Sequence, residues 1–262
     1  MTQVSNLAHV HPGARIGQDV TIEPFVTIQE DVEIGDGCWI ASHAMVCNGA
    51  RIGKNCQIYP GAIIASVPQD LKFQNEYSTV ELGDNVSVRE YATIHRGTAY
   101  SHKTQIGSHV LIMAYSHVAH DCIIHDHAIV ANGTNIAGHV VVGEYAVIGG
   151  MVAVHQFSRI GKHSMIAGGA MVRKDVPPFV MAGRDPISYV GVNHRGIRRR
   201  GYSDESIREI QEVYRTLFLS GHNFSQALDI IEEKFPASTE RDEILDFVRN
   251  SERGIMRGYN FM

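Results

Sequence analysis

Several features are scarce in this chain of 262 residues, and each scarcity excludes a class of protein. The four cysteines form neither a C-x-x-C pair nor a zinc-type spacing, so we expect reduced, buried thiols and no disulfide framework. No apolar run reaches the roughly 18 residues that a transmembrane helix needs, and the N-terminus lacks a basic-then-apolar targeting segment. We therefore expect a cytoplasmic protein without an integral membrane segment.

Basic charge is also in short supply. The formal net charge is −5 at pH 7, whereas a nucleic-acid partner requires a basic surface that neutralises phosphates. We therefore expect no nucleic acid among the partners. Hydrophobic residues make up 44% of the sequence and charged residues 19%, which indicates a folded chain.

What the sequence does contain is a repeat of six residues. An aliphatic residue occupies every sixth position in three segments, Val10–Ile64, Leu82–Ile94 and Ile106–Val172. Two positions earlier in each hexad stands a small or β-branched residue. Helices and coiled coils repeat near 3.6 and 3.5 residues, so neither buries every sixth side chain. Short strands joined by turns do, which predicts a parallel β-helix.

Glycine marks a longer period of 18 residues, at Gly17, Gly35 and Gly53 and again at Gly143 and Gly161. Three hexads would then form one triangular coil, with these glycines supplying a positive φ at a corner. The two interruptions of the repeat insert whole multiples of six, so we expect them to be loops leaving a corner, at about 66–79 and 97–103.

The paired prolines Pro177-Pro178 are expected to stop the addition of strands. Beyond them, Ser203 can cap a helix that Gly221 ends, and apolar spacing predicts a second helix through 224–235 and a third around 244–248. The expected organisation is a β-helical domain at 1–188 and a small α-helical domain at 189–262.

Stacking at 18 residues brings polar side chains together on one part of the wall. His120, Gly138 and Gln156 fall in one column, and Asp121 and His139 fall in the next. His117 and His155 lie beside these columns. A histidine beside a carboxylate is the arrangement of a general base, because the carboxylate fixes the tautomer and stabilises the imidazolium.

Other interpretations of the same histidines remain open from spacing alone. They could be solvated surface residues, or three of them could hold zinc, although the spacing dictates no third ligand and we predict no metal or other cofactor. No serine or cysteine stands in a position typical of a nucleophile, so direct transfer without a covalent intermediate is favoured.

Longer motifs make the chain resemble a known family. The segments His117–Cys122, Ala137–Val140 and Ala153–Phe157 resemble those of the acyl-ACP–UDP-N-acetylglucosamine O-acyltransferases of lipid A biosynthesis (ACP, acyl carrier protein). Further matches are Gln69–Lys72, Ile94–Gly97, Asp175–Pro178, Gly191–Asn193 and Arg199–Gly201.

This resemblance implies a left-handed coil, which spacing does not establish, and a homotrimer with active sites between subunits. The reaction would move an (R)-3-hydroxyacyl group from acyl carrier protein to the glucosamine 3-hydroxyl of UDP-N-acetylglucosamine. His120 matches the general base, Asp121 its orienting carboxylate and Gly138 the oxyanion donor. The substrate-binding matches are Asp70, Lys72, His117, His139, His155, Gln156, Asn193, Arg199 and Arg200.

Some positions depart from, or vary within, the family pattern, among them Tyr115-Ser116, where a more usual pair is Asn-Ala. Arg195 stands where some members carry an acidic residue, which affects the expected nucleotide contacts. Gly168 falls where members vary a side chain that limits acyl length, so the glycine suggests a groove for a long acyl chain.

Four other functions share part of this pattern. A related N-acyltransferase carries a uridine-binding domain before its β-helix, for which we expect no room here, since hexads begin near the N-terminus. An acetyl-CoA-dependent acyltransferase or a trimeric zinc β-helix enzyme would share the repeat. A non-catalytic binding solenoid would present regular threonine ladders instead of clustered histidine and aspartate.

Overall fold

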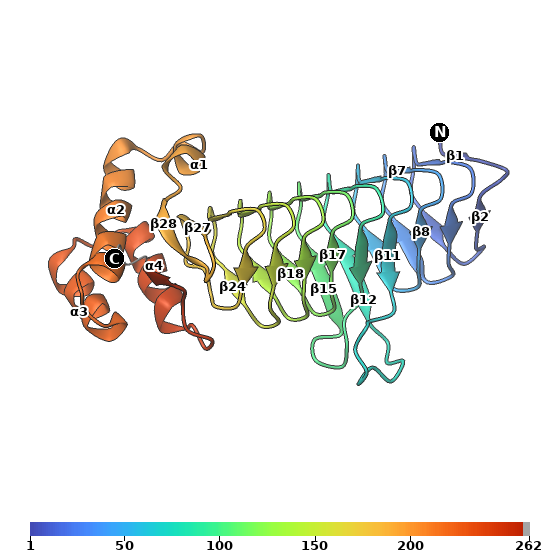
Figure 1. Cartoon of the computed structure of the whole chain (residues 1–262). Coiled ribbons are helices and arrows are strands. Elements are labelled where there is room, and N and C mark those ends of the chain that lie inside the picture. The colour runs from blue at the N-terminus through green and yellow to red at the C-terminus, as the bar shows by residue number, and fades with distance from the viewer. Residues whose placement is uncertain (259–262) are drawn as a thin grey trace.

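The computed structural model describes residues 1–258 and contains a long triangular β-helix with helices packed at its C-terminal end (Figure 1). Each side of the triangle is one sheet of parallel strands. The exception is the C-terminal edge of the first sheet, where two strands pair antiparallel.

The first sheet has twelve strands: β1 (Gln3–Val4), β4 (Thr21–Ile22), β7 (Trp39–Ile40), β10 (Gln57–Ile58), β13 (Ser87–Val88), β16 (Leu111–Ile112), β19 (Ile129–Val130), β22 (Val147–Ile148), β25 (Met165–Ile166), β27 (Val180–Gly183), β28 (Ser188–Val192) and β29 (Arg257–Gly258). The second has nine: β2 (His9–Val10), β5 (Thr27–Ile28), β8 (Met45–Val46), β11 (Ile63–Ser66), β14 (Thr93–His95), β17 (His117–Val118), β20 (Asn135–Ile136), β23 (Ala153–Val154) and β26 (Met171–Val172). The third has eight: β3 (Arg15–Ile16), β6 (Val32–Ile34), β9 (Ala50–Ile52), β12 (Thr79–Leu82), β15 (Lys103–Ile106), β18 (Ile123–Ile124), β21 (Val141–Val142) and β24 (Arg159–Ile160).

The register confirms the predicted stacking at 18 residues. Val118 pairs with Ile136, and Ile136 pairs with Val154. Across the two interruptions, Ile64 pairs with Ile94 and Ile94 with Val118, so each longer coil still closes on a whole number of hexads. The extra residues form the loops between β11 and β12 and between β14 and β15, which protrude together in Figure 1.

The aliphatic column of the repeat forms the core. From Ile22 to Val172 its members are almost completely buried, and Cys38, Cys56 and Cys122 are buried beside them as expected. Each such side chain contributes at most about 1.5–3 kcal/mol to folding. The stacked column therefore makes a stiff scaffold on which outward-facing residues hold fixed positions.

The predicted role of the recurring glycines was wrong. Gly17 and Gly53 do not have a positive φ; that conformation falls two positions later, for example at Asp19 (φ 53°) and Asn55 (φ 54°). A Cβ on Gly53 would come within 2.5 Å of the carbonyl oxygen of Gly83. Glycine is needed there because successive coils approach backbone to backbone.

The paired prolines do not end the sheet, contrary to expectation. Val176 still bridges to Ile160, and β27 pairs in parallel with β25 before β28 turns back antiparallel. Pro177 and Pro178 lie at a corner, where a missing N–H breaks no ladder bond. Because β28 begins at Ser188, the twelve-stranded sheet continues past the expected domain boundary.

Four helices follow: α1 (His194–Arg198), α2 (Asp204–Leu219), α3 (Phe224–Lys234) and α4 (Thr239–Arg249). The Ser203 hydroxyl caps α2 as predicted, accepting from the Ser206 N–H at 3.0 Å. The short helix α1 was not predicted. Positions 259–262 of the expected helical domain lie outside the described residues.

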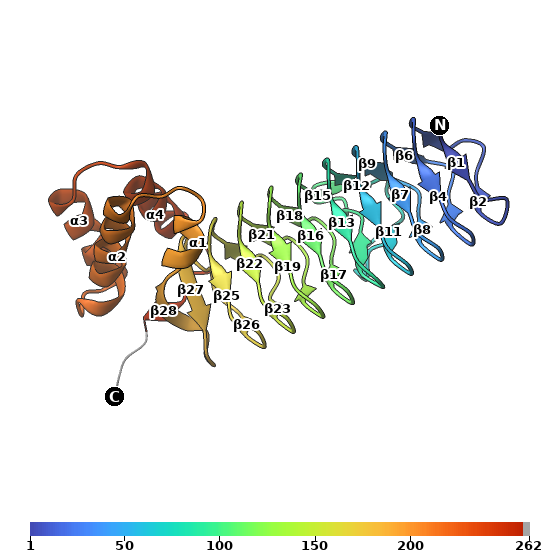
Figure 2. The same cartoon turned by 90° about the horizontal axis from the view of Figure 1, so that it is seen from above.

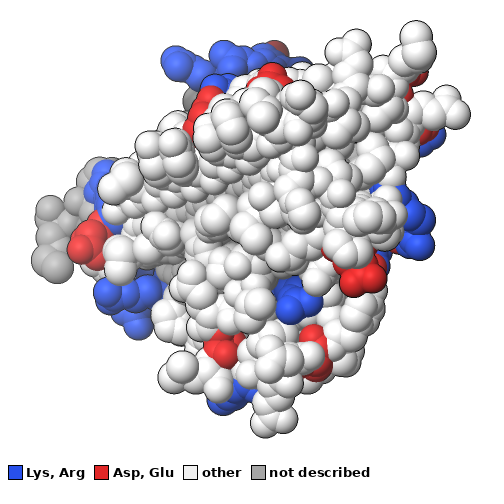
Figure 3. Space-filling model, turned by 90° about the vertical axis from the view of Figure 1, so that its right-hand side faces the viewer, with Lys and Arg blue, Asp and Glu red and all other residues white. Residues whose placement is uncertain are grey.

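Figure 2 shows the helices gathered at one end of the rod, far from the first coil. Most of the opposite end, seen in Figure 3, carries neither cationic nor anionic side chains. Within residues 1–258, no helix has the length and apolarity required to cross a membrane.

Candidate active site

His120 and Asp121 form a close pair at the corner between β17 and β18, in the nine- and eight-stranded sheets. Nδ1 of His120 lies 2.7 Å from Oδ2 of Asp121. The Asp121 side chain is fully buried, whereas that of His120 remains 13% exposed. The carboxylate therefore binds the inner nitrogen of the ring and leaves Nε2 as the nitrogen that can meet a ligand.

Asp121 is held by more than His120. Thr98 donates its backbone N–H to both carboxylate oxygens and its hydroxyl to Oδ2 at 2.7 Å, and Ser101 donates its N–H and hydroxyl to Oδ1. Burial alone raises the pKa of Asp121, but hydrogen bonds from His120, Ser101 and Thr98 outweigh it and hold the pKa far below its usual range. The carboxylate is therefore ionised at neutral pH.

Gly138 lies directly against the imidazole of His120 in the next coil. A Cβ on Gly138 would come within 2.5 Å of Cε1 and 2.7 Å of Nε2 of that ring. No side chain fits there. The backbone N–H of Gly138 donates to no acceptor within residues 1–258, although its carbonyl oxygen accepts from the Phe157 N–H. An unused N–H thus lies beside the free imidazole nitrogen.

His139 packs in the adjoining column. Its ring stacks on Phe157, with centroids 4.2 Å apart, and meets the His120 ring edge to face at 4.9 Å. Burial lowers the pKa of His139, although Asp121 and Asp70 oppose that shift. Nδ1 of His139 is buried with no hydrogen-bond partner among the described residues. His139 is therefore a neutral polar group beside the pair.

His117 approaches from β17. Its Nδ1 lies 2.8 Å from the hydroxyl of Thr93, and burial, followed by the nearby His120, lowers its pKa. The ring also meets His95 edge to face at 4.8 Å. His95 is almost completely buried, and this burial lowers its pKa to about 4. Both rings are neutral at pH 7.

Four predicted residues lie around this cluster. His155 and Gln156 are exposed on the coil beyond Gly138, and Nδ1 of His155 lies 3.1 Å from the carbonyl oxygen of Gln156. Asp70 and Lys72 lie on the loop between β11 and β12, where Oδ1 of Asp70 accepts from the Lys72 N–H at 3.0 Å. The charge of Asp70 acts on His139, so the first loop and three successive coils meet at one corner.

The predicted nucleotide-binding residues lie elsewhere. Asn193, Arg199 and Arg200 line a cavity of about 590 Å³ against the outer face of the twelve-stranded sheet. The guanidinium of Arg200 lies over the Tyr145 ring, 3.7 Å from its centroid. Arg195 lines the same cavity. Within one chain, these residues and His120 occupy different sides of the triangle.

The side chain of Asn193 makes two hydrogen bonds within the protein. Its Oδ1 accepts from the Gly196 N–H at 3.2 Å, which caps α1, and its Nδ2 donates to the His163 carbonyl oxygen at 2.9 Å. The side chain therefore ties α1, which leads into Arg199 and Arg200, to the last coils of the β-helix.

Gly168 lies exposed at the corner after β25. A Cβ there would meet the carbonyl oxygen of Gly150 at 3.2 Å and no other atom closer than 3.8 Å. Its φ is not in the left-handed region, in contrast with the neighbouring Gly169 at 73°. A larger side chain at Gly168 would therefore project outward from the corner.

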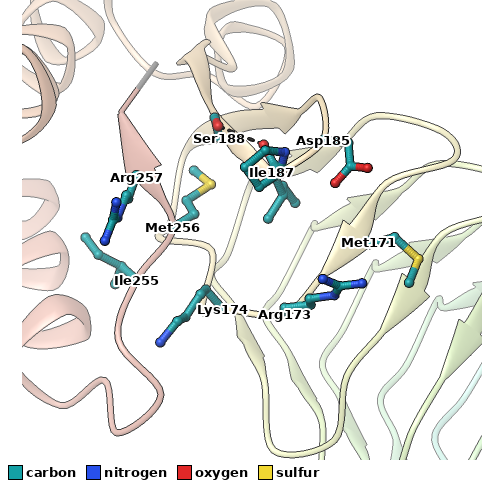
Figure 4. A pocket seen from close by; sticks show the side chains of 10 residues that line it. Met171, Arg173, Lys174, Asp185, Ile187, Ser188, Ile255, Met256 and Arg257 are labelled. Carbon is teal, nitrogen blue, oxygen red and sulfur yellow. Dashed lines mark hydrogen bonds between the residues drawn. The ribbon is translucent and has the colours of Figure 1, made fainter. Parts of the chain in front are cut away.

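A further cavity of about 340 Å³ lies between the last coil, the β27–β28 hairpin and the C-terminal strand (Figure 4). Ile187, Ile255 and Met256 form part of its apolar lining, and its cationic lining residues are Arg173, Lys174 and Arg257. Lys174 falls in the column of His120, three coils further along, so this cavity is separate from the paired histidine and aspartate.

The residues His120, Asp121 and His139 also have the composition of a metal site, with one ligand atom from each lying within 4.8 Å of the others. The hydrogen bonds argue against that use. Both oxygens of Asp121 already accept from Thr98 and one from Ser101, so a cation would have to displace these donors. The arrangement suits an oriented base better.

Sequence reasoning missed Thr98, Ser101 and His95. The first two lie in the inserted loop, where the hexad pattern gives no position for any side chain. His95 follows the last aliphatic residue before that loop, and counting the insertion as one extra hexad would have placed it in the coil beneath Ala119.

Comparisons with known proteins agree with this description. Residues 175–256 match the family model for UDP-N-acetylglucosamine O-acyltransferase, domain 2, and residues 103–138 match the model for bacterial transferase hexapeptide repeats. An acyl-(acyl-carrier-protein)–UDP-N-acetylglucosamine O-acyltransferase of Thermodesulfovibrio yellowstonii is 40% identical over 258 residues, covering 98% of this chain and 100% of the relative.

Solved structures are similar throughout. A UDP-N-acetylglucosamine acyltransferase from Bacteroides fragilis is 48% identical with a TM-score of 0.96, covering 97% of this chain and 100% of that one. The enzyme of the same name from Francisella novicida is 38% identical with a TM-score of 0.95, covering 98% and 95%. The predicted left-handed β-helix with a small helical domain is confirmed.

Proposed function

The chain belongs to the acyl-ACP–UDP-N-acetylglucosamine O-acyltransferase family, and we propose from this premise how its residues carry out the reaction. It is an acyltransferase of lipid A biosynthesis. In our proposal the donor is an (R)-3-hydroxyacyl thioester of acyl carrier protein, and the acceptor is the glucosamine 3-hydroxyl of UDP-N-acetylglucosamine.

His120 is the general base. The observation that carries this assignment is the 2.7 Å contact between its Nδ1 and Asp121, which leaves Nε2 to accept a proton. As Nε2 takes the proton of the sugar hydroxyl, the hydroxyl oxygen attacks the thioester carbonyl carbon and a tetrahedral oxyanion forms. Collapse breaks the carbon–sulfur bond, and the departing thiolate receives the proton from the imidazolium.

Gly138 stabilises the oxyanion. Its N–H has no partner among the described residues, and it lies on the residue whose Cα faces Nε2 of His120. A single oxyanion donor typically supplies about 2.7–4 kcal/mol of transition-state stabilisation. No covalent acyl-enzyme is required, since base and oxyanion donor act on the same carbonyl addition.

The remaining residues bind the sugar nucleotide and the acyl chain. Asp70 and Lys72 contact the sugar from the first loop. The wall around the sugar consists of His117, His139, His155 and Gln156. Arg199 and Arg200 bind the uridine diphosphate, for which a planar guanidinium gives bidentate phosphate contacts. Asn193 holds α1 in place beneath them, and Gly168 leaves space for the acyl chain.

A homotrimer completes the site. His120 lies at a corner between the nine- and eight-stranded sheets, whereas the arginine-lined cavity lies on the twelve-stranded sheet. One chain cannot present both to a single sugar nucleotide, but neighbouring chains around a threefold axis can. We place the enzyme in the cytoplasm, where acyl carrier protein and a sugar nucleotide are both available.

Product analysis tests the reaction. Purified protein is incubated with UDP-N-acetylglucosamine and either a panel of 3-hydroxyacyl carrier-protein donors or acetyl-CoA. We expect a sugar nucleotide that has gained one hydroxyacyl ester, and no acetylated product. Acetyl transfer, or acylation of an amine instead of a hydroxyl, would contradict the proposal.

A further inference from the structure

We propose that Thr98 and Ser101, in the loop between β14 and β15, are positioning residues for acyl transfer: they hold the Asp121 carboxylate in the orientation that fixes His120. The inference rests on the proposed role of His120 as the base. It assigns a catalytic purpose to a loop that carries none of the reacting groups.

The contacts divide the carboxylate between two sets of donors. Oδ2 accepts from Nδ1 of His120 and from the Thr98 hydroxyl, each at 2.7 Å. Oδ1 accepts from the Ser101 hydroxyl and from the Ser101 N–H, the latter at 3.1 Å. Rotation of the carboxylate would break bonds on both oxygens at once.

This division matters because the terminal torsion of an aspartate is soft. Without donors on its far side, the Asp121 carboxylate could turn away from the ring, and His120 would lose the partner that selects its tautomer. The carboxylate is also fully buried. Within the described structure, the loop therefore replaces the hydration that an exposed carboxylate would have.

The loop is itself tied to both sides of the site. The Ala99 N–H donates to Oε1 of Glu76 at 2.8 Å, which joins it to the loop that carries Asp70. The Tyr100 ring meets His139 edge to face at 4.5 Å. Because the loop is held at two further points, its donors keep a defined position relative to the Asp121 carboxylate.

The hydroxyl donors also keep the nearby negative charge directed at His120. The ionisable groups near its ring are Asp121 at the same corner, His117 on β17, His139 on the next coil and, further in, His95 on β14. Asp121 is the only anion among these four. Without its hydroxyl donors the carboxylate can turn away, and the imidazolium that forms during the reaction is then stabilised less.

The test compares Thr98→Val, Ser101→Ala and the double variant with Thr98→Ser, which keeps the hydroxyl. The matched control is Thr104→Val, because the Thr104 hydroxyl is buried in the adjoining strand with no hydrogen-bond partner. We measure kcat and KM for both substrates, the pH profile of kcat and the thermal midpoint.

We expect the double variant to lose roughly 10- to 100-fold in kcat, with each KM within about twofold. The acid limb of its pH profile should move to lower pH, because a carboxylate that turns away stabilises the protonated ring less. Thr98→Ser and Thr104→Val should resemble the unmodified enzyme. An unchanged kcat in a folded double variant would overturn the inference, and so would a lower kcat that comes with a lower thermal midpoint and an unmoved acid limb.

Failure of the proposed function gives a different result. If His120→Ala retains activity, His120 is not the base, whatever Thr98 and Ser101 do. If His120→Ala is inactive while the double variant is fully active, the positioning role of Thr98 and Ser101 is refuted and the role of His120 as the base stands.

Discussion

The imidazole of His120 rests on the Cα of Gly138, so closely that a methyl group there would come within 2.5 Å of Cε1. The contact arises because positions 18 apart are stacked, and it joins the proposed base to the proposed oxyanion donor. Gly138 contributes only its backbone, and the hydrogen bond to Asp121 holds the His120 ring. Their relative position is a property of the coil.

Gly138→Ala should therefore abolish most activity. The added methyl would displace the His120 ring while leaving the backbone N–H in place, and we expect kcat to fall by at least about 100-fold, the contribution of a positioned general base. The control is Gly13→Ala in the first coil, whose methyl would meet only side-chain atoms closely, those of Glu30 and His11. Equal kcat values for the two variants would mean that the contact has no catalytic role.

The six-residue repeat predicted the contact between His120 and Gly138, but it could not predict other parts of the site. Counting in eighteens placed Gly138 over His120 and His139 over Asp121, because the hexad register continues through this part of the chain without insertion. Thr98 and Ser101 lie in a loop, and no periodicity determines where a loop folds back.

The glycines show a second limit of the pattern. A period of 18 at Gly17, Gly35 and Gly53 was visible, but its cause was misassigned to positive φ. Recurrence shows that a residue is required and does not show whether torsion or close contact requires it. The sequence also did not predict that Arg199 and His120 lie on different sides of the triangle, because it does not indicate which side α1 covers.

That separation leads to a complementation experiment. His120→Ala and Arg199→Ala are prepared with different affinity tags, mixed under conditions that exchange subunits, and isolated as mixed oligomers. If each site takes its base from one chain and its arginine from another, one of the three sites in each mixed trimer is intact, so the isolated mixed trimers should show roughly a third of the normal activity. Each variant mixed with itself should stay inactive. No recovery in verified mixed oligomers would place both residues of a site in one chain.

Acyl-chain selection is tested at Gly168. The φ of Gly168 lies outside the left-handed region, and its Cβ would press only on the Gly150 carbonyl oxygen, at 3.2 Å, so Gly168→Met should fold after a small shift and project into the space proposed for the acyl chain. We expect the preference among hydroxyacyl donors to shift to shorter chains, measured as kcat/KM across the panel. The total activity toward a short donor serves as the internal control, and an unchanged profile would remove Gly168 from the acyl site.

Stability should depend on pH through His163. Its ring is stacked between Tyr145 and Phe179, and burial lowers its pKa to about 4 from the usual 6.5. The unfolded chain then binds more protons between these values, so the free energy of unfolding should fall as the pH drops from about 6.5 to about 4. The loss from this group is at most about 3 kcal/mol.

His163→Phe keeps an aromatic ring in the stack and removes the titration. Chemical denaturation at pH 7 and pH 5 should show a smaller difference for this variant than for the unmodified protein. The control is His125→Gln at an exposed position, denatured at the same two pH values. The same pH dependence in both variants would contradict the burial argument.

The most direct test is the rate of His120→Ala at saturating concentrations of both substrates. If the ring of His120 removes the sugar proton, kcat should fall by about 100- to 10,000-fold, since general-base catalysis contributes that much. The KM values and the thermal midpoint should change little. A folded variant whose kcat stays within a few-fold of the original would show that the proton leaves by another route.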